Sequence, residues 1–489
     1  MCIRDSALIQ DVAYQSLLKS TRQHYHQRIA QVLVTQSPEI TATQPELLAH
    51  HYTEAGLPAQ ALPYWHQAGQ RAIARSAYAE ALHHLTTGLE VLAAVPETPV
   101  RHQHELDLLT ALTVALSVTK GGGVPELEPV LTRAATLGQQ VGEPPQWFAA
   151  LQRLFWFRWI RAEFQAAHTA AEQLLDLAQC QHDPFLLLGA HHVMGCLLCL
   201  VGAFAPARTH LEEGIALYDP QRQATPQTTP GGNRDEGVSC RAMVAWALWV
   251  LGYPDQAVQR GQEALTMAHA LAHPYGLANT LFMSAQLHYS RREWQTAQAH
   301  AEAALALATE HGFGRYVASG GLARGAALAA QGQGEAGIAL MRQGLDALRA
   351  TGSAVGMPFH LAHLAEAYGQ VGQLEEGLHL LAEVLAVVDT TGGRQWEAEL
   401  HRLRGELLRQ AVPDTPQAEA CFHQALDIAR RQQAKSWELR AAMSLSRLWL
   451  HQGKRAAAHG LLAPIYGWFT EGFDTADLQD ARALLAELG

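Results

Sequence analysis

The sequence has few charged side chains and no apolar run long enough to cross a membrane. Charged residues make up 17% of the 489 residues, against roughly 25% in average proteins, and a membrane helix needs about 20 consecutive apolar residues. The formal net charge is −11, whereas nucleic-acid-binding domains are usually basic. We therefore expect no membrane span and no nucleic acid partner, and no signal peptide is evident.

Cysteines are scarce, and the common catalytic motifs are missing. The six cysteines show no disulfide framework, which favours a reducing, cytoplasmic compartment. The sequence contains no GxxxxGK[ST] phosphate loop, no HExxH motif and no GxSxG motif. The glycines of residues 120–123, KGGG, follow the lysine and are interpreted as a flexible break between helices. We expect neither catalytic residues nor a cofactor in this chain.

One short motif has residues that bind metals in other proteins. Cys196 and Cys199 form a CxxC inside an apolar helical segment, with His191 and His192 just upstream. A zinc site of this kind needs a turn or a second pair of ligands, and no other repeat offers matching ones. Adjacent histidines on a helix also point about 100° apart. Buried core cysteines are therefore favoured over zinc, and we predict no metal ligand.

What the sequence does contain is a helical hairpin, seen most clearly in residues 363–384. Ala365 and Tyr368 are three residues apart and share one helix face. Gly372 suits the end of that helix, because glycine tolerates the left-handed conformation of a C-cap. Gly377 lets the next helix approach closely. One such hairpin cannot bury its apolar face alone and must stack on copies of itself.

Copies of this hairpin recur along most of the chain. The small residue that Gly377 represents returns at spacings of 40, 50, 40, 40, 40, 41 and 40 residues. These residues are Ala167, Ala207, Ala257, Ala297, Gly337, Gly377, Ala418 and Ala458. The longest spacing contains residues 219–237, which are rich in Pro, Gly, Gln and Thr and are interpreted as a surface loop. The Ala- and Leu-rich composition, without the alternation typical of strands, predicts an all-α protein.

The repeat resembles the tetratricopeptide repeat (TPR), whose usual length is about 34 residues. The resemblance implies a right-handed α-α superhelix of TPR-like helical hairpins, here with a period near 40 residues. We expect amino-terminal TPR-like helices over residues 45–146 and an eight-unit superhelix over residues 147–470. A capping helix is expected within residues 471–489.

Both ends of the chain resemble a family of bacterial regulators. Residues 7–33 read ALIQDVAYQSLLKSTRQHYHQRIAQVL and are similar to the end of the winged-helix segment that follows the nucleotide-binding core of STAND-type signalling ATPases. Residues 429–449 and 466–485 are similar to the closing phrases of regulators that join an adenylate/guanylate cyclase or kinase domain to an AAA-type ATPase and a TPR array. We accordingly expect residues 7–44 to end a winged helix, residues 1–6 to be a non-native leader, and a parent protein that extends upstream.

The resemblance implies a function without catalysis in this chain. It is that of a sensor or protein-interaction region, which relays the binding of an effector or partner to upstream ATPase and cyclase domains. Two alternatives stay open. One is the small-molecule-sensing arm of a MalT-like transcriptional regulator, and the other is a free-standing TPR scaffold.

In TPR superhelices the first helix of each hairpin lines a concave groove, where a protein, a peptide or a small effector can bind. In the first half of this array the groove positions are aromatic. The candidate groove residues are Trp156, Trp159, Trp246, Trp249, Phe282 and Tyr289. Later units place charged residues there, namely Glu366, Arg402, Glu406 and Arg447. A tightly wound superhelix with an aromatic core would produce the same pattern, so groove and core remain alternatives.

Overall fold

The computed structural model describes residue 12 and residues 14–489, except 142–143, 221–234 and 413–414. The expected leader at residues 1–6 and most of the expected loop at residues 219–237 lie outside the described residues. Across the described parts of the chain, all regular secondary structure is helical. None of the described helices is both long and apolar enough to cross a membrane.

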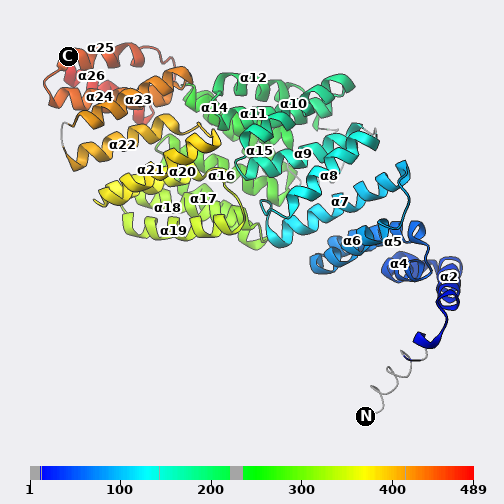
Figure 1. Ribbon diagram of the computed structural model, residues 1–489. Helices are drawn as coiled ribbons and strands as arrows, with labels where there is room; N and C mark the ends of the chain where they lie inside the picture. The colour runs from blue at the N-terminus through cyan, green and yellow to red at the C-terminus, as the bar shows by residue number, and fades with distance from the viewer. Residues whose placement is uncertain (1–11, 13, 142–143, 221–234, 413–414) are drawn as a thin grey trace. The chain divides into compact units, whose positions relative to one another are not determined.

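The chain divides into two compact units, Met1–Leu154 (unit 1) and Phe155–Gly489 (unit 2). The helices of unit 1 are α2 (Lys19–Gln36), α3 (Pro38–Thr43), α4 (Pro45–Glu54), α5 (Pro58–Ala74), α6 (Tyr78–Leu92), α7 (Pro99–Lys120) and α8 (Leu127–Val141) (Figure 1). Helix α9 (Pro144–Ile160) crosses the division between the units. Several of these helices begin at proline, which is tolerated there because the first-turn N–H groups have no partner within the helix.

Unit 2 consists of helical hairpins followed by one last helix. Its helices are α10 (Phe164–Gln181), α11 (Pro184–Leu200), α12 (Phe204–Ala216), α14 (Glu236–Val250), α15 (Pro254–Leu271), α16 (Pro274–Ser290), α17 (Trp294–Glu310), α18 (Gly314–Ala330), α19 (Gly334–Ala350), α20 (Met357–Gln370), α21 (Leu374–Thr391), α22 (Glu397–Ala411), α23 (Pro416–Arg431), α24 (Lys435–His451), α25 (Arg455–Tyr466) and α26 (Ala476–Leu488). The last helix, α26, buries Leu478 and Leu484 against the preceding hairpin. The predicted fold class, an all-α superhelix of TPR-like hairpins, is confirmed.

The small residues that define the repeat lie where hairpin helices approach each other. All eight are buried near the start of the second helix of a hairpin. The approach is closest between α18 and α19, where a Cβ atom added to Gly337 would lie 2.5 Å from the carbonyl oxygen of Gly325. Only glycine fits at such a distance. The glycines between the two helices also have the predicted left-handed backbone, with φ between +76° and +94°. These are Gly202, Gly252, Gly332, Gly372 and Gly453.

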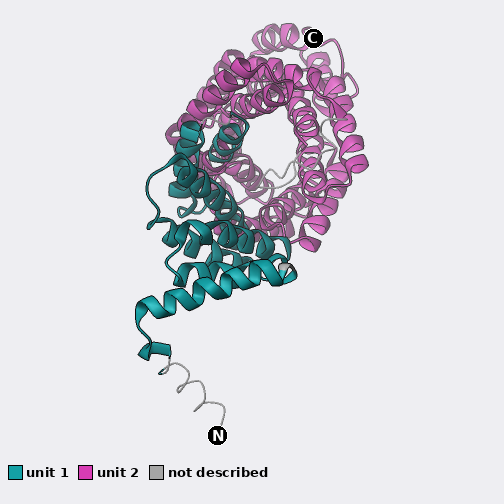
Figure 2. Cartoon of the chain, turned by 90° about the vertical axis from the view of Figure 1, so that its right-hand side faces the viewer, with its two compact units in different colours: residues 1–154 teal, residues 155–489 magenta. Residues whose placement is uncertain are grey.

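The hairpins of unit 2 follow a ring, shown in magenta in Figure 2, and successive turns of this superhelix touch. The backbone nitrogen of Ala354 donates a hydrogen bond to the carbonyl oxygen of Ile160 at 2.8 Å, and that of Gln395 donates to Leu200 at 3.0 Å. Other hydrogen bonds between turns join residues 187 and 217 positions apart. These separations correspond to about five repeats of 40 residues. A second superhelical turn therefore lies directly on the first.

The close approach of hairpin helices can be tested at Ala257, which is fully buried at the start of α15. Replacing it with leucine should overpack the contact with α14 and lower the free energy of unfolding by about 1–3 kcal/mol. Ala270 is exposed on the same helix, so Ala270→Leu is the matched control and should leave the thermal midpoint nearly unchanged. An unchanged midpoint for Ala257→Leu would show that the assigned repeat register is wrong.

Candidate functional site

The first helix of each hairpin forms the inner layer of unit 2. In α14, a first helix, twelve of the 15 residues are buried, whereas in its partner α15 six of 18 are buried. A helix that is buried on nearly all faces must contact neighbours on all sides. The inner helices meet their hairpin partners on one side and the next superhelical turn on another. Side chains on the inner surface therefore belong to an interior.

A narrow cavity of about 80 Å³ lies in this interior, between the two turns. Four of the six candidate groove residues line it, namely Trp156, Trp159, Trp246 and Phe282. The second turn contributes the other wall, with Val355, Gly356, Phe359, His360, Gln395 and Trp396. Because a single water molecule needs about 10–15 Å³ of such space, the cavity as it stands admits a few waters or a small group. It is far smaller than an ordinary ligand pocket.

Aromatic rings from both turns meet around the cavity. The rings of Trp156 and Trp159 pack edge to face with centroids 5.3 Å apart. Trp246 faces Trp396 of the next turn at 6.3 Å, and Phe282 faces His360 at 6.2 Å. Such pairs contribute about 0.5–1.5 kcal/mol each beyond the area that they bury. The walls are therefore joined by aromatic contacts that a ligand would have to replace.

One charged group lines the cavity. The guanidinium of Arg315 lies over the ring of Trp159, 5.3 Å from its centroid. Within the described parts of the chain no carboxylate forms an ion pair with Arg315, and its buried Nε has no hydrogen-bond acceptor. Burial, with a smaller effect of Arg315, lowers the pKa of the cavity residue His360 to about 3. At neutral pH the cavity therefore has one cation and a neutral imidazole.

The other two candidate residues do not line the cavity. Trp249 packs edge to face on Trp437 of α24, with ring centroids 4.8 Å apart. The Tyr289 hydroxyl donates a hydrogen bond to Glu366 at 3.0 Å, and its ring lies 3.9 Å from that of His363. Burial, then the charge of Glu366, raises the pKa of Tyr289. Trp249 therefore packs on the next superhelical turn, whereas Tyr289 packs on α20, two hairpins further along the chain.

Three of the four charged groove positions belong to a buried polar cluster. Arg402 makes two hydrogen bonds to the Glu399 carboxylate, at 2.7 and 2.8 Å, and lies 3.8 Å from Glu406. Burial raises the pKa of Glu366, although Arg402 opposes this. The fourth, Arg447, has a 42% exposed side chain and lies 4.0 Å from Asp480. The predicted charged half of the groove is thus mostly an interior ion-pair network.

The CxxC motif is part of the packed interior. Cys196 and Cys199 are buried in α11, and burial raises the pKa of the Cys199 thiol well above its usual value. A thiol that resists ionisation is a poor metal ligand, because the thiolate is the ligating form. Cys196 instead forms part of the cavity wall.

In comparison with known proteins, the chain matches part of a longer curated protein. No protein-family model matches it. A curated protein of Rhizobium meliloti (strain 1021), named only as uncharacterized, is 26% identical over 451 residues. The match covers 91% of this chain and 43% of that protein. The chain therefore spans less than half the length of the curated relative that it matches.

Solved structures of helical-repeat proteins resemble the chain more weakly. A Rap protein in complex with competence and sporulation factor has a TM-score of 0.49 and 12% identity, and the match covers 82% of this chain and 99% of that one. A STAND protein with a tetratricopeptide repeat sensor from Pyrococcus horikoshii has a TM-score of 0.41 and 15% identity, covering 82% and 60%. Likenesses of this size transfer no ligand, partner or activity to this chain.

Proposed function

We propose that this chain is the non-catalytic sensor and interaction region of a bacterial signal-transduction ATPase linked to a nucleotide cyclase. The resemblance of residues 7–33 to the end of a winged helix supports this proposal, as do the closing phrases of the array. A relative more than twice as long fits a multidomain parent. The observation that carries the sensing role is the narrow cavity between two superhelical turns.

The input is a small anionic effector that enters between the turns. Arg315 is a cation without a carboxylate partner among the described residues, beside aromatic walls, and such a group pairs with a carboxylate or phosphate. An effector larger than the present cavity must separate the turns in order to bind. Binding energy then shifts the spacing of the whole array, because a ligand favours the state that it fits better.

In this proposal, the amino-terminal helix α2 transmits effector binding to the upstream domains. This helix carries exposed apolar residues at helical spacing, namely Tyr25, Ile29 and Val32, each more than 40% exposed. Exposed apolar stripes on a helix are typical of interaction surfaces. We assign this face to a preceding part of the parent polypeptide, because residues 7–33 resemble a segment that follows the nucleotide-binding core of STAND-type ATPases. Ile29→Glu should then uncouple the parent protein's nucleotide hydrolysis from effector binding.

The domain context can be decided by sequencing the genomic DNA upstream of Ala7. An in-frame winged helix, a phosphate loop and a cyclase domain would support the proposal. A DNA-binding domain joined to this chain would support the MalT-like regulator instead. A start codon with a ribosome-binding site at Met1 would support the free-standing scaffold.

The input site is tested by replacing Arg315 with glutamine. We expect carboxylate and phosphate metabolites that raise the thermal midpoint of the wild-type chain to lose this effect in Arg315→Gln. At a ligand concentration 100 times its Kd, the lost stabilisation is about 2.7 kcal/mol. Arg349→Gln is the matched control, because Arg349 is an exposed arginine on α19. Equal stabilisation of both variants would refute an anion site at Arg315.

A further inference from the structure

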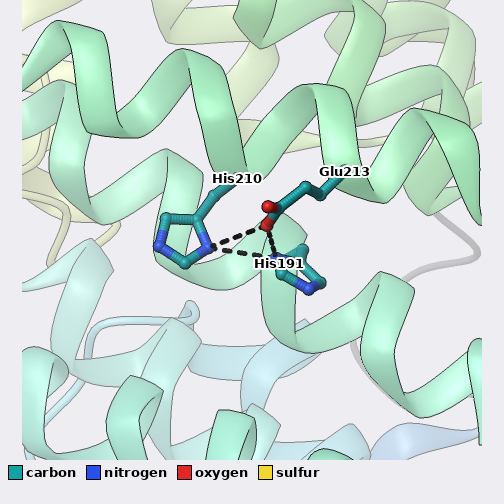
Figure 3. A group of neighbouring side chains, drawn as sticks. All are labelled: His191, His210 and Glu213. Atoms are coloured by element: carbon teal, nitrogen blue, oxygen red, sulfur yellow. Dashed lines mark hydrogen bonds and ion pairs between the residues drawn. The ribbon is translucent and has the colours of Figure 1, made fainter.

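Two histidines and a glutamate converge on one point of the first complete hairpin of unit 2. His191 lies on α11, and His210 and Glu213 lie one turn apart on α12. Their ligand atoms all lie within 4.8 Å of one another. Figure 3 shows the three side chains directed toward each other from the two helices. Within the residues that the structure describes, no other group of His, Cys, Asp and Glu side chains brings three ligand atoms this close together.

The spacing of the three atoms matches the radius of a metal ion's first coordination sphere. The Nδ1 atoms of His191 and His210 are 3.0 Å apart. Glu213 Oε2 lies 3.1 Å from the first and 4.0 Å from the second. A point equidistant from all three lies about 2.0 Å from each, which is the usual Zn–N and Zn–O bond length of about 2.0–2.2 Å. This point lies in the plane of the three atoms, so a small rotation of the half-exposed Glu213 side chain toward His210 is needed to give a tetrahedral arrangement.

Hydrogen bonding alone leaves this arrangement poorly satisfied. Each neutral imidazole carries one proton on either of its nitrogens, and an ionised carboxylate accepts hydrogen bonds only. If His191 Nδ1 is the donor, its single N–H is shared between the His210 nitrogen and the Glu213 oxygen. A cation at the central point would satisfy the lone pairs of all three groups at once.

The helices hold the ligands in place. A Cβ atom added to Gly195 would lie 2.5 Å from Leu211 Cγ, so α11 and α12 approach closely one turn from His191. Gly214 faces the Cβ of His191, at 3.6 Å from an added Cβ. Two positions without side chains therefore bring the ligands of the two helices together. Such preorganisation lowers the cost of binding an ion.

The site is open to solvent on one side. The side chains of His191, His210 and Glu213 are 13%, 25% and 53% exposed. His210 also lines a cleft of about 700 Å³ between the α11–α12 turn and the α23–α24 turn. Three protein ligands with access for water are the pattern of a zinc site with an open coordination position.

We propose that His191, His210 and Glu213 bind a divalent zinc ion, with water or an anionic group from solvent as the fourth ligand. The imidazole and carboxylate donors suit Zn²⁺ rather than Ca²⁺ or Mg²⁺, which prefer oxygen ligands. The ion joins α11 to α12 at the start of the array. The CxxC motif takes no part, and its cysteines lie in the neighbouring interior.

The test measures zinc binding to the tag-free chain after removal of metals with a chelator. We expect one high-affinity Zn²⁺ per wild-type chain by metal analysis after dialysis and by chelator competition. His210→Ala should weaken binding on the order of 100-fold, at least as much as the loss of an outer-shell partner, which costs about 10–100-fold. With Co²⁺ in place of Zn²⁺, the visible absorption of a four-coordinate site should appear in the wild type and be lost in the variant.

The matched control is His379→Ala. His379 and Glu383 form an exposed His–Glu pair, 3.2 Å apart, on α21. The His379→Ala variant should therefore leave zinc binding unchanged. Glu213→Gln keeps the shape of a half-exposed side chain, so it tests the site even if a histidine variant unfolds, and it too should weaken binding. Equal zinc binding by the wild type, His210→Ala and Glu213→Gln would overturn the proposal, as would a wild type that retains no zinc.

Discussion

Replacing Trp396 with alanine is expected to lower the free energy of unfolding of unit 2 by about 3–5 kcal/mol. Trp396 is buried between superhelical turns, 3% exposed. Its ring lies 4.9 Å from Trp437 and 5.0 Å from Phe359, and it faces Trp246 of the previous turn. Alanine would leave a cavity at a contact that joins the two turns.

Urea unfolding followed by circular dichroism measures this loss. Leu271 at the end of α15 is 44% exposed, so Leu271→Ala is the control and should cost less. In a repeat protein, hairpins that lose their contact with the next turn retain only their sequence neighbours. We therefore also expect the unfolding transition of Trp396→Ala to broaden. A loss below about 1 kcal/mol would contradict a structural role for the contact between turns.

The hairpins could be predicted because their causes are local in the sequence. Gly372 ends one helix of the hairpin, and Gly377 allows the next helix to approach it closely. Both glycines affect only helices within about ten residues of themselves. The buried small residues and the positive φ angles confirm this reasoning. The 40-residue period predicts a superhelix of hairpins because the same local hairpin pattern is repeated along the chain.

The contacts between turns could not be predicted in the same way. Whether Trp246 meets Trp396 depends on the rotation added by each of the three hairpins between them, and small errors in each accumulate. The repeat register predicts which positions of the inner helices are aromatic. It does not predict which residues elsewhere in the array contact them. For this reason Trp249, which has the same pattern as Trp246, lies against the next turn, and Tyr289 lies against α20, rather than at the cavity.

The same limit applies to the zinc ligands. Sequence reasoning compared His191 with its neighbours His192, Cys196 and Cys199, which lie on the same helix. The ligands that approach it, His210 and Glu213, come from the antiparallel partner helix. A search for His or carboxylate residues at facing positions of each hairpin would have found them.

Glu399→Ala is expected to have an equally large effect, lowering the free energy of unfolding by about 3–5 kcal/mol. The Glu399 carboxylate is buried, accepts two hydrogen bonds from Arg402 and lies 3.5 Å from Arg440. Without it, Arg402 is a buried cation whose next carboxylate, Glu406, is 3.8 Å away. The exposed pair Asp346–Arg349 has the same three-residue spacing, so Asp346→Ala is the control and should cost about 0–1 kcal/mol.

The double variant Glu399→Leu with Arg402→Met separates the cost of an unpaired charge from the value of the pair. Removing one partner strands a buried charge, whereas removing both replaces an ion pair by apolar contacts of similar size. The double variant should therefore be more stable than Glu399→Ala, as measured by urea unfolding. If instead the effects of the single changes simply add, the stability that Arg402 contributes does not depend on Glu399.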